Sequence, residues 1–114
     1  MKQTLVALMA FGLMTTVAFA HSKTEQTTPA NNATVEAVKI LEMRFDDPMR
    51  VTAISMTGPD GAVDIERQTG MDAVTEFRAL PPADLTHGHY TVDWRGLSAD
   101  GHPMQGSFGF TLSN

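Results

Sequence analysis

The segment 90–112 constrains the fold more than any other part of the chain. Residues 90–95 and 107–112 each alternate apolar and polar side chains, which is the pattern of a strand with one buried face. Between them lies a short polar connector, residues 97–103, which contains Asp100-Gly101-His102. The segment therefore predicts a pair of neighbouring strands that present a carboxylate and an imidazole at their joined end.

The rest of the chain repeats this kind of signal, and no stretch shows a helical period. Asp46-Asp47-Pro48 is expected to end one strand, and the turn signal Gly58-Pro59-Asp60-Gly61 is expected to join two others. The further strands that we expect cover residues 39–45, 51–56, 62–66 and 73–80. Six or seven short strands at this spacing predict an all-β domain, a small antiparallel sandwich or barrel.

The predicted core consists of the apolar side chains that fall on the inward faces of these strands. They are Val38, Leu41, Met43, Phe45, Ile54, Phe77, Tyr90, Val92, Trp94, Phe108 and Phe110.

The first twenty residues have the features of a secretory signal peptide. Lys2 is followed by a short apolar run, and Ala18-Phe19-Ala20 supplies the small residues at which a signal peptidase cleaves. We expect residues 1–20 to be removed and residues 21–114 to form one exported, periplasmic domain that starts at His21. The apolar run is too short for a membrane span, and none is expected in the mature domain.

Composition excludes several classes of function. Without residues 1–20 the chain keeps 94 of its 114 residues, and the loss of Lys2 leaves 7 Lys+Arg against 13 Asp+Glu, a net charge of −6. Nucleic acids and anionic lipids bind clustered basic residues, so neither is an expected partner. The chain has no cysteine, which excludes thiolate metal sites and cysteine nucleophiles and leaves the core alone to stabilise the domain.

A mature chain that begins with His21 offers an unusual chelator. The free α-amine and the ring of His21 can bind one metal ion together, and Cu(II) prefers such nitrogen and oxygen donors in a tetragonal plane. Asp100 and His102 lie two residues apart, so an extended backbone would project both to one side. These three residues can complete a Cu(II) site if the fold brings them together. The alternative is that processing leaves a terminal histidine by coincidence.

The mature sequence resembles the CopC family of periplasmic copper-binding proteins. The resemblance rests on His21, on Thr28-Pro29-Ala30, on Leu41–Asp47 and above all on the run from Gly88 to Gly106, and it covers essentially the whole mature domain. It implies a Greek-key β-sandwich or barrel of the cupredoxin or immunoglobulin-like kind. It also implies one Cu(II) per chain and no enzymatic activity.

The same resemblance implies roles for individual residues. His21 would supply its amine and ring, His102 a ring nitrogen and Asp100 a carboxylate, while Asp47 would be an axial or outer ligand or else only part of its turn. Some members hold Cu(I) in a methionine-rich loop, but the corresponding stretch here has Met56 as its only thioether. Because thioethers select Cu(I), we expect no Cu(I) site.

Two alternatives to a copper buffer or carrier stay open. One is a copper monooxygenase with a histidine brace, and the other is a metal-free β-sandwich that serves as an interaction module. His87 and His89 form a His-x-His pair, which we interpret as a solvated turn rather than a weak second metal site. The expected partners are the copper ion and either a membrane copper transporter or another periplasmic copper protein.

Overall fold

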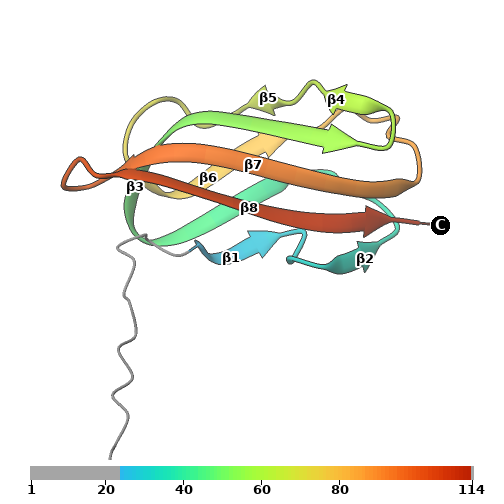
Figure 1. Ribbon diagram of the computed structural model, residues 1–114, viewed down its shortest axis with the longest axis horizontal. Helices are drawn as coiled ribbons and strands as arrows, with labels where there is room; N and C mark the ends of the chain where they lie inside the picture. Colours follow the sequence, from blue (N-terminus) through green and yellow to red (C-terminus); the bar gives the residue numbers. More distant parts are fainter. Residues whose placement is uncertain (1–23, 114) are drawn as a thin grey trace, which may run out of the picture.

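The computed structural model describes residues 24–113, and these residues form an all-β domain of eight strands (Figure 1). The strands are β1 (Thr24–Thr28), β2 (Ala33–Val35), β3 (Leu41–Gly58), β4 (Gly61–Val63), β5 (Glu66–Arg67), β6 (Val74–Leu80), β7 (Gly88–Ser98) and β8 (Pro103–Leu112). In this part of the chain no helix has the length and apolar character needed to cross a membrane. The predicted all-β class is confirmed, with more strands than expected. The proposed signal peptide and His21 lie outside the described residues.

Strand β3 joins the two layers of the domain. Its first half, Leu41–Arg44, pairs with β6 on one side and with β1 on the other, whereas Met49–Thr57 pairs with β7. Between these halves the pairing shifts, and the strand curves round one end of the molecule, as Figure 1 shows at its left. The strand therefore passes from one layer to the other, and its bend defines the end of the domain on which the candidate site lies.

This bend corrects one expectation. Asp46-Asp47-Pro48 was expected to end a strand, but the structure continues β3 through all three residues. Pro48 lacks an N–H and cannot donate a ladder hydrogen bond, which fits its place in the stretch where pairing with β6 is interrupted. Asp46-Asp47-Pro48 thus bends β3 where its pairing with β6 is interrupted, and the strand continues beyond it.

The last two strands form the predicted hairpin. Gly88–Leu97 of β7 pairs in continuous antiparallel register with Pro103–Leu112 of β8. At the other edge of β8, the short strand β2 runs parallel, with Ala33 opposite Phe110 and Val35 opposite Leu112. The sheet is therefore antiparallel apart from this one pair, which the sequence did not predict.

The core contains all of the predicted residues, with Val38 and Ile54 only partly buried at its margin. Rings in the core pack in pairs: Phe45 meets Trp94 edge to face with centroids 5.2 Å apart, and Tyr90 stacks on Phe110 at 5.5 Å. Six further buried residues were not in the list of predicted core residues: Met49, Val51, Met56, Ala79, Met104 and Leu112. Three of these six are methionines, whose flexible thioethers fill irregular gaps.

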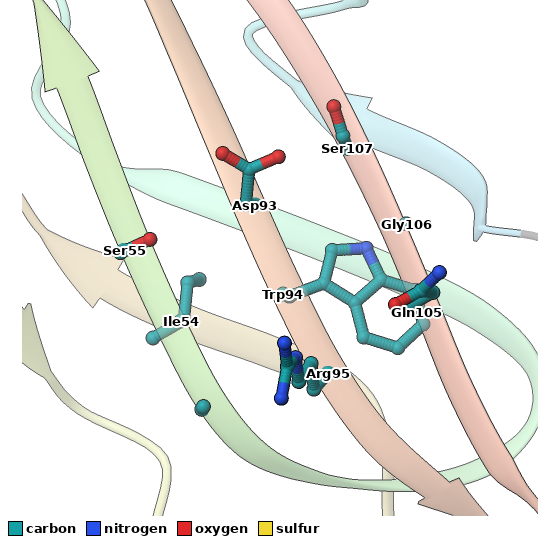
Figure 2. Close-up of a pocket in the computed structure, with 9 residues that line it drawn as sticks. Ile54, Ser55, Asp93, Trp94, Arg95, Gln105, Gly106 and Ser107 are labelled. Atoms are coloured by element: carbon teal, nitrogen blue, oxygen red, sulfur yellow. The ribbon is translucent and has the colours of Figure 1, made fainter.

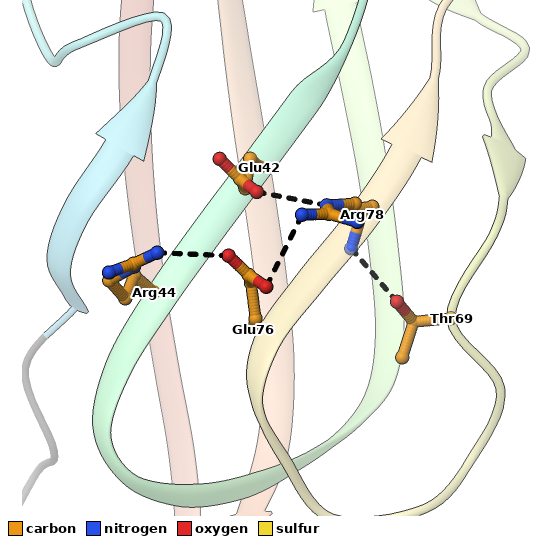
Figure 3. A network of polar contacts seen from close by, with 5 residues as sticks. All are labelled: Glu42, Arg44, Thr69, Glu76 and Arg78. Atoms are coloured by element: carbon orange, nitrogen blue, oxygen red, sulfur yellow. Dashed lines mark hydrogen bonds and ion pairs between the residues drawn. The ribbon is translucent and has the colours of Figure 1, made fainter.

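On the outside of the β3–β6 layer, charges of opposite sign alternate. Glu76 accepts hydrogen bonds from Arg44 at 3.0 Å and from Arg78 at 3.3 Å, and Arg78 also donates to Glu42 at 2.9 Å (Figure 3). The two arginines, Arg44 first, lower the pKa of Glu76 below its ordinary value. All four side chains are open to solvent, so the network ties β3 to β6 with a small contribution to stability.

Candidate metal centre

The turn between β7 and β8 carries two of the four predicted metal ligands. The Ser98 N–H donates to the His102 carbonyl and the Gly101 N–H donates to the Ser98 carbonyl, both at 2.9 Å, which closes the turn over residues 99–102. Gly101 has a φ of 87°, in the left-handed region that favours glycine. The sequence Asp100-Gly101-His102 therefore forms the tip of the hairpin rather than an extended strand.

Within this turn Asp100 and His102 are in direct contact. Nδ1 of His102 lies 3.0 Å from Oδ1 of Asp100, and their side chains are 66% and 69% exposed, respectively. The same Oδ1 also accepts a short hydrogen bond from the Ser98 hydroxyl. These contacts, that from Ser98 first and that from His102 second, lower the pKa of Asp100 below its ordinary value. The turn therefore presents an ionised carboxylate beside an imidazole whose Nε2 is directed away from this contact.

Three segments that are distant in sequence meet at this end of the domain. Phe45 of β3 pairs with Thr24, the first described residue, and Met49 of β3 pairs with Ser98, the last residue of β7. Asp47 lies midway between these two positions on the bend and is exposed. The start of β1, the bend of β3 and the β7–β8 turn are thus neighbours in the sheet.

The structure does not group all of the predicted ligands. Among residues 24–113, no three His, Asp or Glu side chains lie close enough together to hold a metal ion, so Asp47 is not clustered with Asp100 and His102. His21 lies outside the described residues, three positions before Thr24. Since an extended chain spans about 3.5 Å per residue, roughly 10 Å separates the two at most. The assignments of His21 and Asp47 stay predictions.

His87 and His89 lie at the opposite end of β7 from this turn. His89 approaches β8, with its Nδ1 3.3 Å from the Thr111 hydroxyl. His87 instead lines a hollow of about 420 Å³ together with Glu36 and Leu112. The eleven residues Gly88–Ser98 of β7 correspond to about 33 Å of strand from the first to the last, so this pair takes no part in the candidate metal centre.

The hollow drawn in Figure 2 is also separate from the Asp100–His102 pair. It has a volume of about 670 Å³ and lies on the outer face of β3, β7 and β8, where Asp93 and Arg95 point outward between small side chains. Ser55, Asp93 and Ser107 form one row across the three strands. None of the predicted ligands lines this hollow.

Sequence analysis missed Ser98 as part of the site. Its hydroxyl accepts from the His102 N–H at 3.1 Å in addition to its bond to Asp100. The available signal was a serine two residues before an aspartate within the predicted connector 97–103, because such hydroxyls commonly bond to nearby groups in turns.

Comparison with known proteins gives a consistent result. The family model described as the CopC domain matches residues 24–113. The chain is 35% identical to copper resistance protein C of Pseudomonas syringae pv. tomato, over 97% of this chain and 96% of that protein. It superimposes on CopC from Methylosinus trichosporium OB3b with a TM-score of 0.70 and 29% identity, covering 82% of this chain and 94% of that one. PcoC from Escherichia coli, a methionine-rich copper resistance protein, gives a TM-score of 0.67 and 26% identity, covering 82% and 100%.

Proposed function

The chain belongs to the CopC family, and from that premise we propose that it is a periplasmic Cu(II)-binding protein that buffers or delivers copper. One observation carries this proposal beyond family membership. Asp100 and His102, which lie in the run that carries the resemblance, touch each other on an exposed turn, and this turn lies at the end of the domain where β1 begins. A ligand set shared between the turn and the chain before β1 is therefore within reach.

We assign the donors from the contacts that each side chain already makes. Because Nδ1 of His102 faces Asp100, its Nε2 is the nitrogen available to copper. Because Oδ1 of Asp100 accepts a hydrogen bond from Ser98 and also lies against Nδ1 of His102, its Oδ2 is the oxygen available. His21 would add its amine and ring nitrogen, which gives three nitrogens and one oxygen, a set that suits Cu(II).

Asp47 has a weaker assignment. Its exposed position on the β3 bend, between the pairing positions of Thr24 and Ser98, supports an axial or outer role. With Asp100 and Asp47 both ionised, two negative charges would balance the two positive charges of the ion. The proposed site would then hold copper as a nearly neutral complex.

A carrier fits the arrangement better than an enzyme does. A copper monooxygenase needs an equatorial position open to oxygen, and in our assignment Asp100 fills that position. The four methionines that are buried in the described domain (Met43, Met49, Met56 and Met104) have no surface from which to bind Cu(I). Met71 is 52% exposed, but one thioether does not make a Cu(I) site. We therefore propose one Cu(II) per chain and no Cu(I) site.

The test is to determine the mature N-terminus and the copper ligands in one sample. N-terminal sequencing of the exported protein should begin at His21, and the Cu(II) electron paramagnetic resonance spectrum should show three nitrogen ligands. A variant with one extra alanine before His21 keeps the ring but loses the terminal amine as its chelating partner. Its Cu(II) affinity should fall at least about 10-fold. Loss of a residue that only supports a metal ligand already costs roughly 10–100-fold, and here a ligand itself is lost.

The matched control carries one extra alanine after Asn114, at the other end of the chain. It should bind Cu(II) as the wild type does. Equal affinity and equal spectra for all three proteins would exclude His21 as a ligand.

A further inference from the structure

Ser98 makes more hydrogen bonds within the β7–β8 turn than either Asp100 or His102 does. Its backbone N–H and carbonyl bond to His102 and Gly101, and its hydroxyl bonds to both Asp100 and His102. The two hydroxyl bonds are chemically compatible, since a hydroxyl has one hydrogen to donate and lone pairs to accept. The hydroxyl donates to Oδ1 of Asp100 and accepts from the His102 N–H at 3.1 Å.

The side chains of Asp100 and His102 have few other constraints. Each is about two-thirds exposed, at 69% and 66%, so core packing does not fix their rotamers. Gly101 between them has a φ of 87° and no side chain, which leaves the tip of the turn open. Ser98, by contrast, is half-buried at the end of a strand paired on both sides. The end of a paired strand therefore holds the Asp100 carboxylate and the His102 backbone N–H through one hydroxyl.

We propose that Ser98 is a positioning residue of the metal centre, whose hydroxyl fixes the Asp100 carboxylate and the His102 backbone in their binding arrangement before copper arrives. This inference rests on the proposed function and adds to it a residue that does not contact the ion. The Ser98 bridge orders the turn in the metal-free protein, so less freedom is lost when the ion binds.

The Ser98 hydroxyl donates to Oδ1 of Asp100, and a hydrogen bond donated to a carboxylate favours its ionised form. The carboxylate is thus kept ready as a ligand while Oδ1 is held in place. Oδ2 and the His102 Nε2 remain for the ion.

The experiment compares three variants of the mature, exported protein. Ser98→Ala removes the hydroxyl, Ser98→Thr keeps it with a methyl that a strand tolerates, and Ser107→Ala is a matched control on β8. Ser107 is exposed and lies opposite Asp93, far along the hairpin from the turn. Two measurements are made on each: hydrogen exchange of the His102 amide without metal, and Cu(II) affinity by competition with a chelator, together with the Cu(II) spectrum.

Ser98→Ala should speed hydrogen exchange of the His102 amide and alter the Cu(II) spectrum. It should also weaken Cu(II) binding about 10-fold, which is the lower end of the range for loss of a residue that supports a metal ligand. Ser98→Thr should restore all three readouts, and Ser107→Ala should match the wild type. Unchanged exchange in Ser98→Ala overturns the proposal, and so does faster exchange with unchanged affinity. If the wild type itself bound no Cu(II), the proposed function would fail, and the exchange data would still decide whether Ser98 orders the turn.

Discussion

Nδ1 of His102 lies 3.0 Å from Oδ1 of Asp100 in the turn that joins β7 to β8. A histidine that ligates a metal commonly places its other ring nitrogen against a carboxylate, which fixes the orientation of the ring. Here that carboxylate is itself a proposed ligand, and the same oxygen, Oδ1, also accepts a hydrogen bond from the Ser98 hydroxyl. The five residues 98–102 thus contain both proposed metal ligands and the hydroxyl that orients one of them.

Replacement of His102 should remove most of the binding. His102→Ala is expected to lower Cu(II) affinity at least about 100-fold, because it removes a direct ligand whereas outer partners alone account for roughly 10–100-fold. His89→Ala is the matched control, since His89 is also an exposed histidine but contacts Thr111 near the far end of β7. Competition titrations with a chelator measure both. Equal losses in the two variants would contradict the assignment.

Cu(II) affinity should fall as the pH is lowered from 8 to 5.5. Free α-amines titrate at about 8 and free imidazoles at about 6.5, and both must lose their protons to bind a metal. Binding of one copper ion should release about one proton at a pH between about 6.5 and 8, and more than one proton at a pH below about 6.5. Competition titrations at four or five pH values test this, and an affinity that stays constant over the range would exclude amine and imidazole ligands.

The metal-free domain should lose stability in acid partly through Asp100 and Glu76. Both have a pKa below the ordinary value, Asp100 first because of Ser98 and Glu76 first because of Arg44. A carboxylate with a lowered pKa stabilises the fold above its unfolded pKa of about 4, and this contribution is lost as the pH falls through the folded pKa.

Urea unfolding at pH 7, 5 and 3 measures this effect. Asp100→Asn and Glu76→Gln should each flatten the decline below pH 5, and by a small amount because both side chains are exposed. Gln105→Asn, a change at an exposed side chain that carries no charge, serves as the control and should leave the slope unchanged. A variant slope equal to that of the wild type would show that the native contacts do not favour the ionised forms.

Gly96 should be intolerant of any side chain. A Cβ at this position would lie 2.6 Å from the Arg50 carbonyl oxygen and 3.0 Å from the Met49 sulfur, and the carbonyl belongs to the backbone of the paired strand. Gly96→Ala is therefore expected to lower the free energy of unfolding by about 1–3 kcal/mol, the usual cost of overpacking. At Gly70 a Cβ would meet nothing within 4 Å, so Gly70→Ala should be neutral or slightly stabilising. Chemical denaturation of both variants compares them directly.

Much of the fold was predictable because alternation of apolar and polar residues is a local signal. The hairpin of β7 and β8 follows from Tyr90, Val92 and Trp94 on one strand and Phe108, Phe110 and Leu112 on the other, all six of which are buried. The continuous course of β3 was not predictable in this way. Asp46-Asp47-Pro48 has the composition of a turn, and only the pairing of its two halves in different layers makes it a bend.

The candidate site divides along the same line. Asp100 and His102 were identified because residue type and a two-residue spacing are visible in sequence. The hydrogen bonds from Ser98 form only because the backbone makes a tight turn with Gly101 at positive φ. In the extended backbone that the sequence predicted, Ser98 and His102 would lie too far apart for such a bond. The nearness of β1 to the β3 bend is a long-range pairing, Thr24 with Phe45, that no local pattern encodes.

The exposure of the Asp100–His102 pair has a consequence for how copper would leave. An ion held by side chains that are each about two-thirds open to water can be approached by a competing donor while it is still bound. Departure would then be stepwise, with one bond replaced at a time and no opening of the sandwich. The transfer rate should accordingly rise with the concentration of the acceptor, whereas release from an enclosed cage would be set by the cage alone.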